Sequence, residues 1–292
     1  MRASILFGLV LVASASAFVP VQTGYHATVG IPTAEKIRTY EEELFKNRTT
    51  FERIVGGQLA PTNEHPYFAG LLISLVGLPT GNSVCGATLV SPNRLVTAAH
   101  CWDDGVYQGW QAVVILGTNF LFNGGTRITT TEVVVHPRWN VATVANDIAV
   151  MYLPTNVQLS GDIQPVSLPV SFELYLTYEG MPAVAVGYGR TSDQQGGISS
   201  VLNHVGLAIT SNYFCESIFS PEFVRDSTIC TSGAGGVGIC TGDSGGPLLV
   251  RLAGRTILVG VSSFVARNNC QGGLPSAYAR VTSHSIFINQ NL

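Results

Sequence analysis

Three side chains that together could carry out nucleophilic catalysis lie far apart in the sequence. Ser244 stands in CTGDSGGPLL, between an aspartate and two glycines. A serine hydroxyl is a weak nucleophile unless a general base lies within hydrogen-bond reach and a third group orients that base. His100, in LVTAAHCW, could be this base, and Asp147, in NDIAVMYL, could orient it. Taken singly, each residue also fits a plain structural role at a strand end, in a turn or in a glycine-rich loop.

The segments that would position these residues have the pattern of β-strands. The chain has 292 residues, of which 46% are hydrophobic, which is enough for one large or two smaller cores. From residue 54 onward, short apolar or alternating runs rich in Val, Ile and Thr are separated by turns of Gly, Pro, Asn and Ser. This pattern predicts an all-β sandwich or barrel. PLLVRLAGRTILVGVSSF predicts a hairpin that turns at Ala253, Gly254 and Arg255, and SNYFCESIF and the final SHSIFINQNL are the helix candidates.

The N-terminal part differs from the rest of the chain. Residues 1–17, MRASILFGLVLVASASA, have the basic start, short apolar run and small-residue ending of a signal peptide cleaved before Phe18. Residues 18–53 are charged, lack cysteine and carry a glycosylation sequon at Asn47. We interpret them as an appended pro-segment, partly helical or else a disordered tail. No later run approaches the ~20 apolar residues of a membrane helix, so we expect a soluble, secreted protein without a membrane partner.

The six cysteines favour disulfides over a metal. All lie between Cys85 and Cys270, and an even count in a secreted chain indicates three disulfides, for which ~15 pairings exist. Zinc is the alternative, but the sequence has no C-x-x-C pair, and the histidine beside a cysteine has no second ligand at metal spacing. We therefore expect no metal. From residue 54 onward, nine Arg face thirteen Asp and Glu without a basic run, so nucleic-acid binding is not expected either.

The motifs TAAHC, DIAV and GDSGGP, in that order, are those of a known family. Over about residues 54–292 the chain resembles the chymotrypsin-like serine proteases, and it is similar to secreted digestive enzymes of insects and other arthropods. The resemblance implies two antiparallel six-stranded β-barrels, about 54–160 and 161–292, a short C-terminal helix and an active site in the cleft between the barrels. His100 and Asp147 would come from the first barrel and Ser244 from the second. No cofactor is implied, and the partners would be protein or peptide substrates.

The resemblance also implies how the site is completed. The backbone N–H groups of Gly242 and Ser244 would form the oxyanion hole, which stabilises the charge that develops on the substrate carbonyl oxygen. The first disulfide would secure the loop after His100, and the third would tie the Ser244 loop to a wall of the substrate pocket. The implied pairings are Cys85–Cys101, Cys215–Cys230 and Cys240–Cys270.

FERIVGGQ is similar to the activation junction of the family's zymogens, although it could also be an ordinary strand after a charged loop. A trypsin-like protease would cleave after Arg53 and free the ammonium group of Ile54. That ammonium would pair with Asp243 and hold the 242–244 turn in its working geometry, since a buried carboxylate requires a paired charge. No cysteine retains residues 18–53, so we expect this pro-segment to leave after activation.

The pocket that the resemblance implies is apolar. Its floor would be Gly238, where an aspartate would be needed to hold a basic substrate side chain. Val265 would fill part of the slot, so we expect an elastase-like preference for small or medium apolar residues. A chymotrypsin-like preference for larger groups is the alternative, because the floor at Gly238 is roomy. The alignment could start from either adjacent serine, and we choose Ser263 over Ser262 because an aromatic residue then follows it. The other expected wall residues are Phe264 and Ser276.

The absence of lysine from residue 54 onward suggests a setting. Lysine loses its charge near pH ~10.4 whereas arginine keeps it, and a chain without lysine offers fewer sites to trypsin-like proteases. Both features fit an alkaline extracellular fluid such as a gut lumen. A regulatory protease of a cascade, with a longer N-terminal region that contains cysteine, and an inactive binding homologue, which would have lost a catalytic residue, are the competing classes. We expect a monomer that could also bind protein inhibitors.

Overall fold

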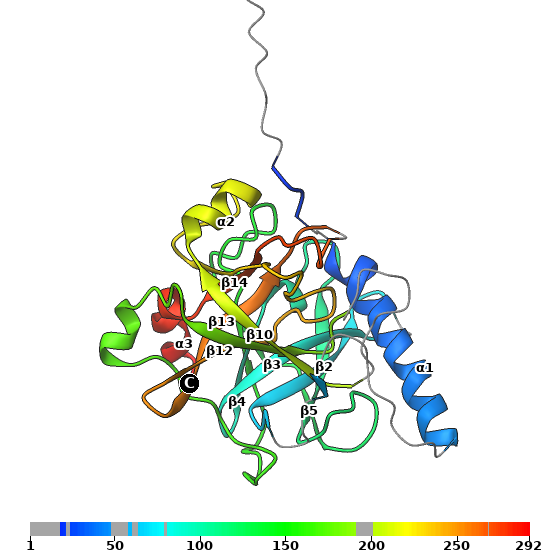
Figure 1. The fold of residues 1–292 in the computed structure, drawn as a ribbon. Coiled ribbons are helices and arrows are strands. Elements are labelled where there is room, and N and C mark those ends of the chain that lie inside the picture. The colour runs from blue at the N-terminus through cyan, green and yellow to red at the C-terminus, as the bar shows by residue number, and fades with distance from the viewer. Residues whose placement is uncertain are drawn as a thin grey trace, which may run out of the picture.

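The computed structural model describes residues 18–21, 24–47, 58–59, 64–78, 81–190, 201–267 and 269–292. The expected signal peptide and the expected activation residues Arg53 and Ile54 lie outside these described residues. Two antiparallel sheets dominate the fold (Figure 1). Among the described helices, none is long and apolar enough to cross a membrane.

The first sheet contains the strands of the N-terminal half. Its seven strands lie in the order β6-β5-β2-β3-β4-β8-β7. Only Thr131 and Glu132 separate β6 from β7, so one bent segment supplies both edge strands and the sheet curls into a half-barrel. If that segment is counted as one strand, the sheet has the six expected strands. The bounds are β2 (Phe68–Leu75), β3 (Ser83–Ser91), β4 (Arg94–Thr97), β5 (Gly109–Leu116), β6 (Thr126–Thr130), β7 (Val133–Val135) and β8 (Ala149–Tyr152).

The second sheet closes on itself. Strand β10 pairs with both β9 and β11, so six strands form a closed barrel in the order β9-β10-β11-β14-β13-β12, with β1 added alongside β10. The hairpin between β12 and β13 turns at Ala253 and Gly254, both with positive φ, as the sequence predicts. The bounds are β1 (Gln58–Leu59), β9 (Pro182–Gly187), β10 (Asn203–Thr210), β11 (Thr228–Thr231), β12 (Pro247–Leu252), β13 (Arg255–Phe264) and β14 (Ser276–Arg280).

Short helices complete the fold, and both helix candidates of the protease part are confirmed. Helix α2 (Asn212–Phe219) begins at Ser211, whose hydroxyl accepts a hydrogen bond from the Phe214 N–H. Helix α3 (Ser285–Gln290) is the C-terminal helix. Helix α1 (Ile31–Asn47) shows that the segment before the protease part is indeed partly helical. Single-turn helices span η1 (His26–Gly30), η2 (Ala99–Cys101), η3 (Ser171–Tyr175) and η4 (Thr282–His284).

Helix α1 packs against the first sheet. In Figure 1 it is the long blue helix at the edge of the molecule. Ile37 is fully buried and Ala34 nearly so, and both belong to the same core as the buried residues of β2, β3 and β5. Fully burying a side chain such as isoleucine stabilises by roughly 1.5–3 kcal/mol. The appended segment is therefore part of the folded structure.

Candidate active site

A disulfide fixes the segment that carries His100. Strand β4 ends at Thr97, and η2 then places His100 next to Cys101, which is bonded to Cys85 of β3. The Thr97 hydroxyl donates to the Gly86 carbonyl oxygen at 2.7 Å and holds the end of β4 on β3. The structure contains all three expected disulfides, Cys85–Cys101, Cys215–Cys230 and Cys240–Cys270.

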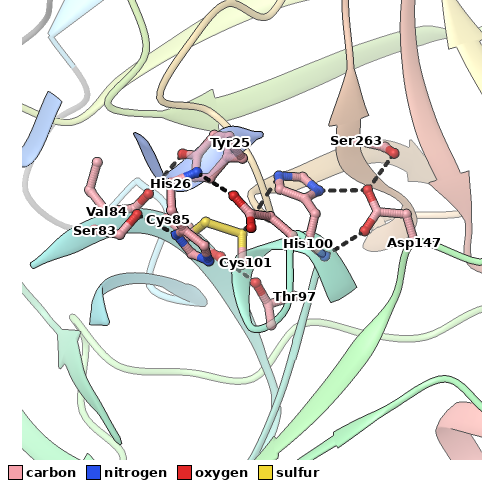
Figure 2. The surroundings of a disulfide bond; sticks show 12 residues. Tyr25, His26, Ser83, Val84, Cys85, Thr97, His100, Cys101, Asp147 and Ser263 are labelled. Carbon is pink, nitrogen blue, oxygen red and sulfur yellow. Dashed lines mark hydrogen bonds and ion pairs between the residues drawn. A yellow bond between two sulfur atoms is a disulfide. The ribbon is translucent and has the colours of Figure 1, made fainter. Parts of the chain in front are cut away.

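The carboxylate of Asp147 binds His100 through two hydrogen bonds, one to the backbone and one to the imidazole. The backbone N–H of His100 donates to Asp147 Oδ1 at 2.9 Å, and ring Nδ1 lies 2.7 Å from Oδ2 (Figure 2). Asp147 is only 1% exposed, so little water competes for the carboxylate. Because an ionised carboxylate can only accept, Nδ1 carries the proton and Nε2 is left as the acceptor. This tautomer is the one a general base needs.

A third donor to Asp147 comes from Ser263, one of the two adjacent serines. The Ser263 hydroxyl donates to Asp147 Oδ2 at 2.5 Å (Figure 2). Ser262 points the other way and is fully buried, since successive residues of a strand face opposite sides. The structure thus places Ser263 beside the catalytic candidates, and gives it a contact to Asp147 that the sequence analysis did not anticipate.

Ser244 lies in a turn that only glycine can build. Gly242 and Gly245 have φ of 104° and 77°, a region that favours glycine. A Cβ added to Gly245 would lie 2.3 Å from Thr97 Oγ1 and 2.4 Å from the Gly86 carbonyl oxygen. The Gly86 N–H in turn donates to the Ser244 carbonyl oxygen at 2.7 Å, which ties the turn to β3. Ser244, His100 and Ser263 line one cavity.

Tyr25 lines the same cavity, beside His100. Its ring packs against the His100 ring, with centroids 4.8 Å apart, and its hydroxyl donates to the Val84 carbonyl oxygen at 2.7 Å (Figure 2). Burial raises the pKa of the Tyr25 phenol, and the nearby Ser244 side chain opposes that rise. Among the described residues, no hydrogen bond joins His100 to Ser244 in this arrangement. No motif in the sequence marked Tyr25 as part of the site.

Asp243, beside Ser244, accepts two backbone hydrogen bonds. The Gly189 N–H donates to Oδ1 at 2.7 Å and the Cys240 N–H to Oδ2 at 2.9 Å. Burial nevertheless raises the pKa of the Asp243 carboxyl to about 6, because the two N–H groups only partly offset desolvation. The described residues leave a cavity of about 290 Å³ next to this carboxyl, with Gly189 and Asn203 in its lining.

The expected pocket residues are divided between two cavities. Ser263, Phe264 and Val265 line the cavity that holds Ser244 and His100. Gly238 lines the larger cavity beside Asp243 instead. Ser276 is buried against Gly238, because a Cβ on that glycine would lie 2.7 Å from Ser276 Oγ. The structure therefore places Gly238 beside Ser276 and apart from the wall at residues 263–265. In this arrangement the expected pocket residues do not line one common cavity.

A second histidine cluster, which the sequence analysis did not single out, contains Glu64, His65 and His204. His65 Nε2 and His204 Nδ1 lie 2.7 Å apart and share a hydrogen bond, and His65 Nδ1 bonds with the Tyr67 hydroxyl at 3.0 Å. Burial, reinforced by His204, lowers the pKa of His65 to about 4. Glu64 Oε2 lies 3.5 Å from the same His204 Nδ1.

Comparison with known proteins shows the family. The trypsin family model matches residues 54–288. Brachyurin from Leptuca pugilator is 38% identical over 231 residues, covering 78% of this chain and 94% of brachyurin. A collagenase from Hypoderma lineatum is 33% identical over 239 residues, covering 82% of this chain and 87% of the collagenase. A solved structure of HL collagenase, 33% identical, superposes with a TM-score of 0.73 and covers 82% of this chain and 98% of that one. This chain belongs to the trypsin family and is a serine endopeptidase.

Proposed function

We propose that the chain is the secreted zymogen of a digestive endopeptidase, in which Ser244, His100 and Asp147 act as nucleophile, general base and orienting carboxylate. One observation carries this assignment. The Asp147 carboxylate fixes His100 with its proton on Nδ1, and the same cavity contains the Ser244 hydroxyl. Secretion rests on the signal-peptide pattern of residues 1–17.

In the proposed reaction, Ser244 Oγ attacks the carbonyl carbon of the scissile peptide bond while His100 Nε2 accepts the hydroxyl proton. Asp147 stabilises the imidazolium ion that forms. The imidazolium then donates its proton to the leaving amine, and water repeats the sequence on the acyl-enzyme. The N–H groups of Gly242 and Ser244 would stabilise the oxyanion, and loss of one such donor typically lowers turnover by ~10²–10³.

Activation would follow cleavage after Arg53. The new Ile54 ammonium would enter the cavity beside Asp243, whose carboxyl is disfavoured in its charged form while it lacks a cationic partner. An ion pair there would lower the pKa of Asp243 and fix the adjacent 242–244 turn. The same movement would join Gly238 and Ser276 to the wall at Val265 and complete the substrate pocket.

Substrates would be cleaved after apolar residues. Gly238 and Ser276 offer no charge for a basic side chain, and Val265 narrows the wall, which favours small or medium side chains. A preference for large aromatic residues or leucine is the alternative, and discrimination should be broad because one methylene contributes only ~1–3 kcal/mol. The name collagenase, borne by the Hypoderma lineatum relative and by the solved structure, adds collagen as a candidate substrate.

The test is to secrete the full chain, cleave it with trypsin, inhibit the trypsin selectively, and profile the product on a peptide library varied at the residue before the cut. We expect cleavage after Ala, Val or Leu and none after Lys or Arg. Digestion of native collagen fibrils by the same material tests the collagen candidate. A product that begins at Ile54, has been separated from residues 18–53 and hydrolyses no peptide in the library would contradict the proposed function.

A further inference from the structure

The segment before the protease part runs through the cleft in the manner of a bound peptide. Val21 forms an antiparallel bridge with Ala266, and the Arg267 N–H donates to the Pro20 carbonyl oxygen at 3.1 Å. Val21 is 8% exposed and packs in one cluster with Phe264. Adding a strand to an exposed edge is a common way for a protein to bind an extended peptide.

The described residues just after this pairing lie at the catalytic candidates. Gly24 and Tyr25, three and four residues after Val21, both line the cavity that contains Ser244 and His100. With Tyr25 in place this cavity measures about 60 Å³, against roughly 300 Å³ or more for typical ligand pockets. The segment thus covers the position where a scissile bond would lie.

Gly24 and His26 turn the chain away from an extended geometry at this point. Gly24 has φ of 62°, which an extended substrate does not adopt. The His26 N–H donates to Asp104 Oδ2 at 2.8 Å. The His26 ring Nδ1 lies 2.7 Å from Ser83 Oγ (Figure 2). The segment therefore enters the cleft in the direction of a strand and leaves it as the helical turn η1, which distinguishes it from a substrate.

Helix α1 anchors the segment beyond the cleft. Glu41 is fully buried, and its carboxylate accepts hydrogen bonds from Leu121 N–H at 2.7 Å, Phe122 N–H at 3.0 Å and Asn123 Nδ2 at 2.8 Å. A charged side chain bound by three donors is a specific attachment point, since leaving those donors without a partner would be costly. Thr33, at the start of the helix, lies against Gly242 of the expected oxyanion turn.

We propose that residues 18–47 are an inhibitor built into the chain, which occupies the catalytic cleft and stays bound after the chain is cut at Arg53. Activation would then need two events, cleavage and dissociation of this segment. The inference rests on the proposed catalytic role of Ser244 and His100. It revises the expectation that the segment leaves because no disulfide holds it, since the buried contacts of Tyr25, Ile37 and Glu41 provide a noncovalent attachment.

The experiment starts from the cleaved full chain. Trypsin cuts it, dilution releases the segment, and a sizing column then separates the segment from the protease that begins at Ile54. A synthetic peptide of residues 18–47 is added back at increasing concentration. We expect hydrolysis of a small peptide ester to fall with a competitive pattern, and activity before separation to rise on dilution. An active, separated protease that this peptide does not inhibit would overturn the inference. A separated protease that is inactive on every ester and amide would instead count against the proposed function.

Matched peptide variants test the individual contacts. Tyr25→Ala should weaken inhibition by about 100-fold, because it empties the space beside His100 and Ser244. Glu41→Gln should weaken it by about 10- to 100-fold, because a charge that accepts three hydrogen bonds is lost. The controls are Tyr40→Ala and Glu42→Gln, at exposed positions of the same helix, which should inhibit like the parent peptide. Equal losses for the exposed and the buried positions would contradict the proposed placement.

Gly30 supplies a further variant, which adds a methyl group to the segment and does not truncate a side chain. A Cβ added to Gly30 would lie 1.8 Å from Ser83 Oγ and 3.0 Å from Tyr25 Cε1, so Gly30→Ala forces the Ser83 hydroxyl away from its partner His26 and weakens docking of the segment. In the full chain, cut after Arg53 and assayed without separation, this variant should be several-fold more active than the parent. Equal activity of the two cut chains, with both shown to begin at Ile54, would overturn the inference.

Discussion

The carboxylate of Asp147 accepts three hydrogen bonds, two from His100 and one from the Ser263 hydroxyl. A substitution of Ser263 removes the third bond and leaves His100 unchanged. Ser263→Ala should lower kcat of the activated protease by about tenfold or more, the usual effect of losing a hydrogen bond to a charged group. The expected cause is a less firmly held imidazole. The measurement is kcat and KM on a peptide amide, with kcat falling more than KM rises.

Ser262 is a matched control for this prediction. Its hydroxyl is buried and, among the described residues, has no hydrogen-bond partner. Ser262→Ala should therefore leave kcat within about twofold of the parent, since removing an unpaired buried hydroxyl costs little. Equal effects of the two substitutions would argue against the hydrogen bond to Asp147.

His26 makes docking of the N-terminal segment sensitive to acid. Burial, reinforced by His100, lowers the pKa of His26 to about 4, whereas Asp104 and Asp103 act in the opposite direction. Docking thus favours the neutral ring, so affinity should be full above pH ~6.5 and fall by up to tenfold per unit as the pH drops towards 4. Binding of the 18–47 peptide to the activated Ser244→Ala protease, measured by calorimetry, reports this without depending on catalysis.

The pH dependence of binding, measured again with an 18–47 peptide that carries His26→Gln, isolates the contribution of the His26 imidazole. Glu41 acts in the opposite sense, because burial raises the pKa of its carboxyl and its protonation favours the docked form. The parent peptide should therefore lose more affinity between pH 6.5 and 4.5 than the glutamine variant, which keeps only the effect of the other groups. Parallel profiles for the two peptides would exclude His26 as the acid-sensitive group.

A functional residue could be found from the sequence when it stands in a recognisable short motif. Ser244, His100 and Asp147 stand in short motifs that combine in a fixed order, so they could be singled out at once. The sequence does not reveal which of Ser262 and Ser263 faces Asp147. Adjacent residues of β13 face opposite sides, so the answer depends on the strand register, and the β13–β14 pairing is irregular between Ser262 and Phe264. Tyr25 gave no signal, because its role depends on packing against residues far along the chain.

At the scale of elements, the turn that carries Ser244 is held in place by close contact with the other sheet. Gly245→Ala should destabilise the protein by about 3 kcal/mol or more and abolish activity, because the new Cβ would collide with Thr97 and Gly86 at a positive φ. Urea unfolding measures the stability and ester hydrolysis the activity.

Gly254 provides the comparison within the same chain. It has φ of 79°, close to that of Gly245, but a Cβ there would meet nothing within 4 Å. Gly254→Ala should cost only about 1–2 kcal/mol, the strain of the left-handed backbone, and should keep full activity. If the two variants were equally destabilised, backbone strain and not the contact between the sheets would be the cause.

The strands, the β12–β13 hairpin and helices α2 and α3 could be predicted because their signals are local, in alternating apolar residues and turn residues. Helix α1 was only partly predicted. Its helical pattern is visible, but its position depends on the buried Glu41 carboxylate meeting Leu121 and Phe122, about eighty residues later. A pattern within one segment does not reveal which distant surface that segment covers.

At the scale of the whole molecule, the proposed activation makes Asp243 the link between cleavage after Arg53 and the catalytic turn. Asp243→Asn should leave the uncut chain folded but lower kcat/KM of the cut chain by about 100-fold or more, the range seen when an oxyanion donor is misplaced. Active-site titration of both cut chains gives the fraction of competent enzyme. Normal activity in the cut variant would contradict the proposed ion pair with Ile54.

The uncut chain should also show the raised pKa of Asp243 in its stability. The folded value of about 6 exceeds the ordinary 3.8, so the folded state binds more protons between these values. The contribution of this group is most favourable below about pH 3.8 and is lost as the pH rises through about 6. Between pH 5 and 7.5, urea unfolding should show a smaller decline in stability for Asp243→Asn than for the parent, and identical profiles would contradict the assignment.

The most direct measurement is the mass of the protein after reaction with an organophosphonate specific for activated serines. We expect one adduct, on Ser244, in the cut and separated protease, little adduct in the uncut chain, and none when His100→Ala is introduced. Full labelling of the His100→Ala variant, or a cut and separated protease in which Ser244 stays unmodified, would contradict the account.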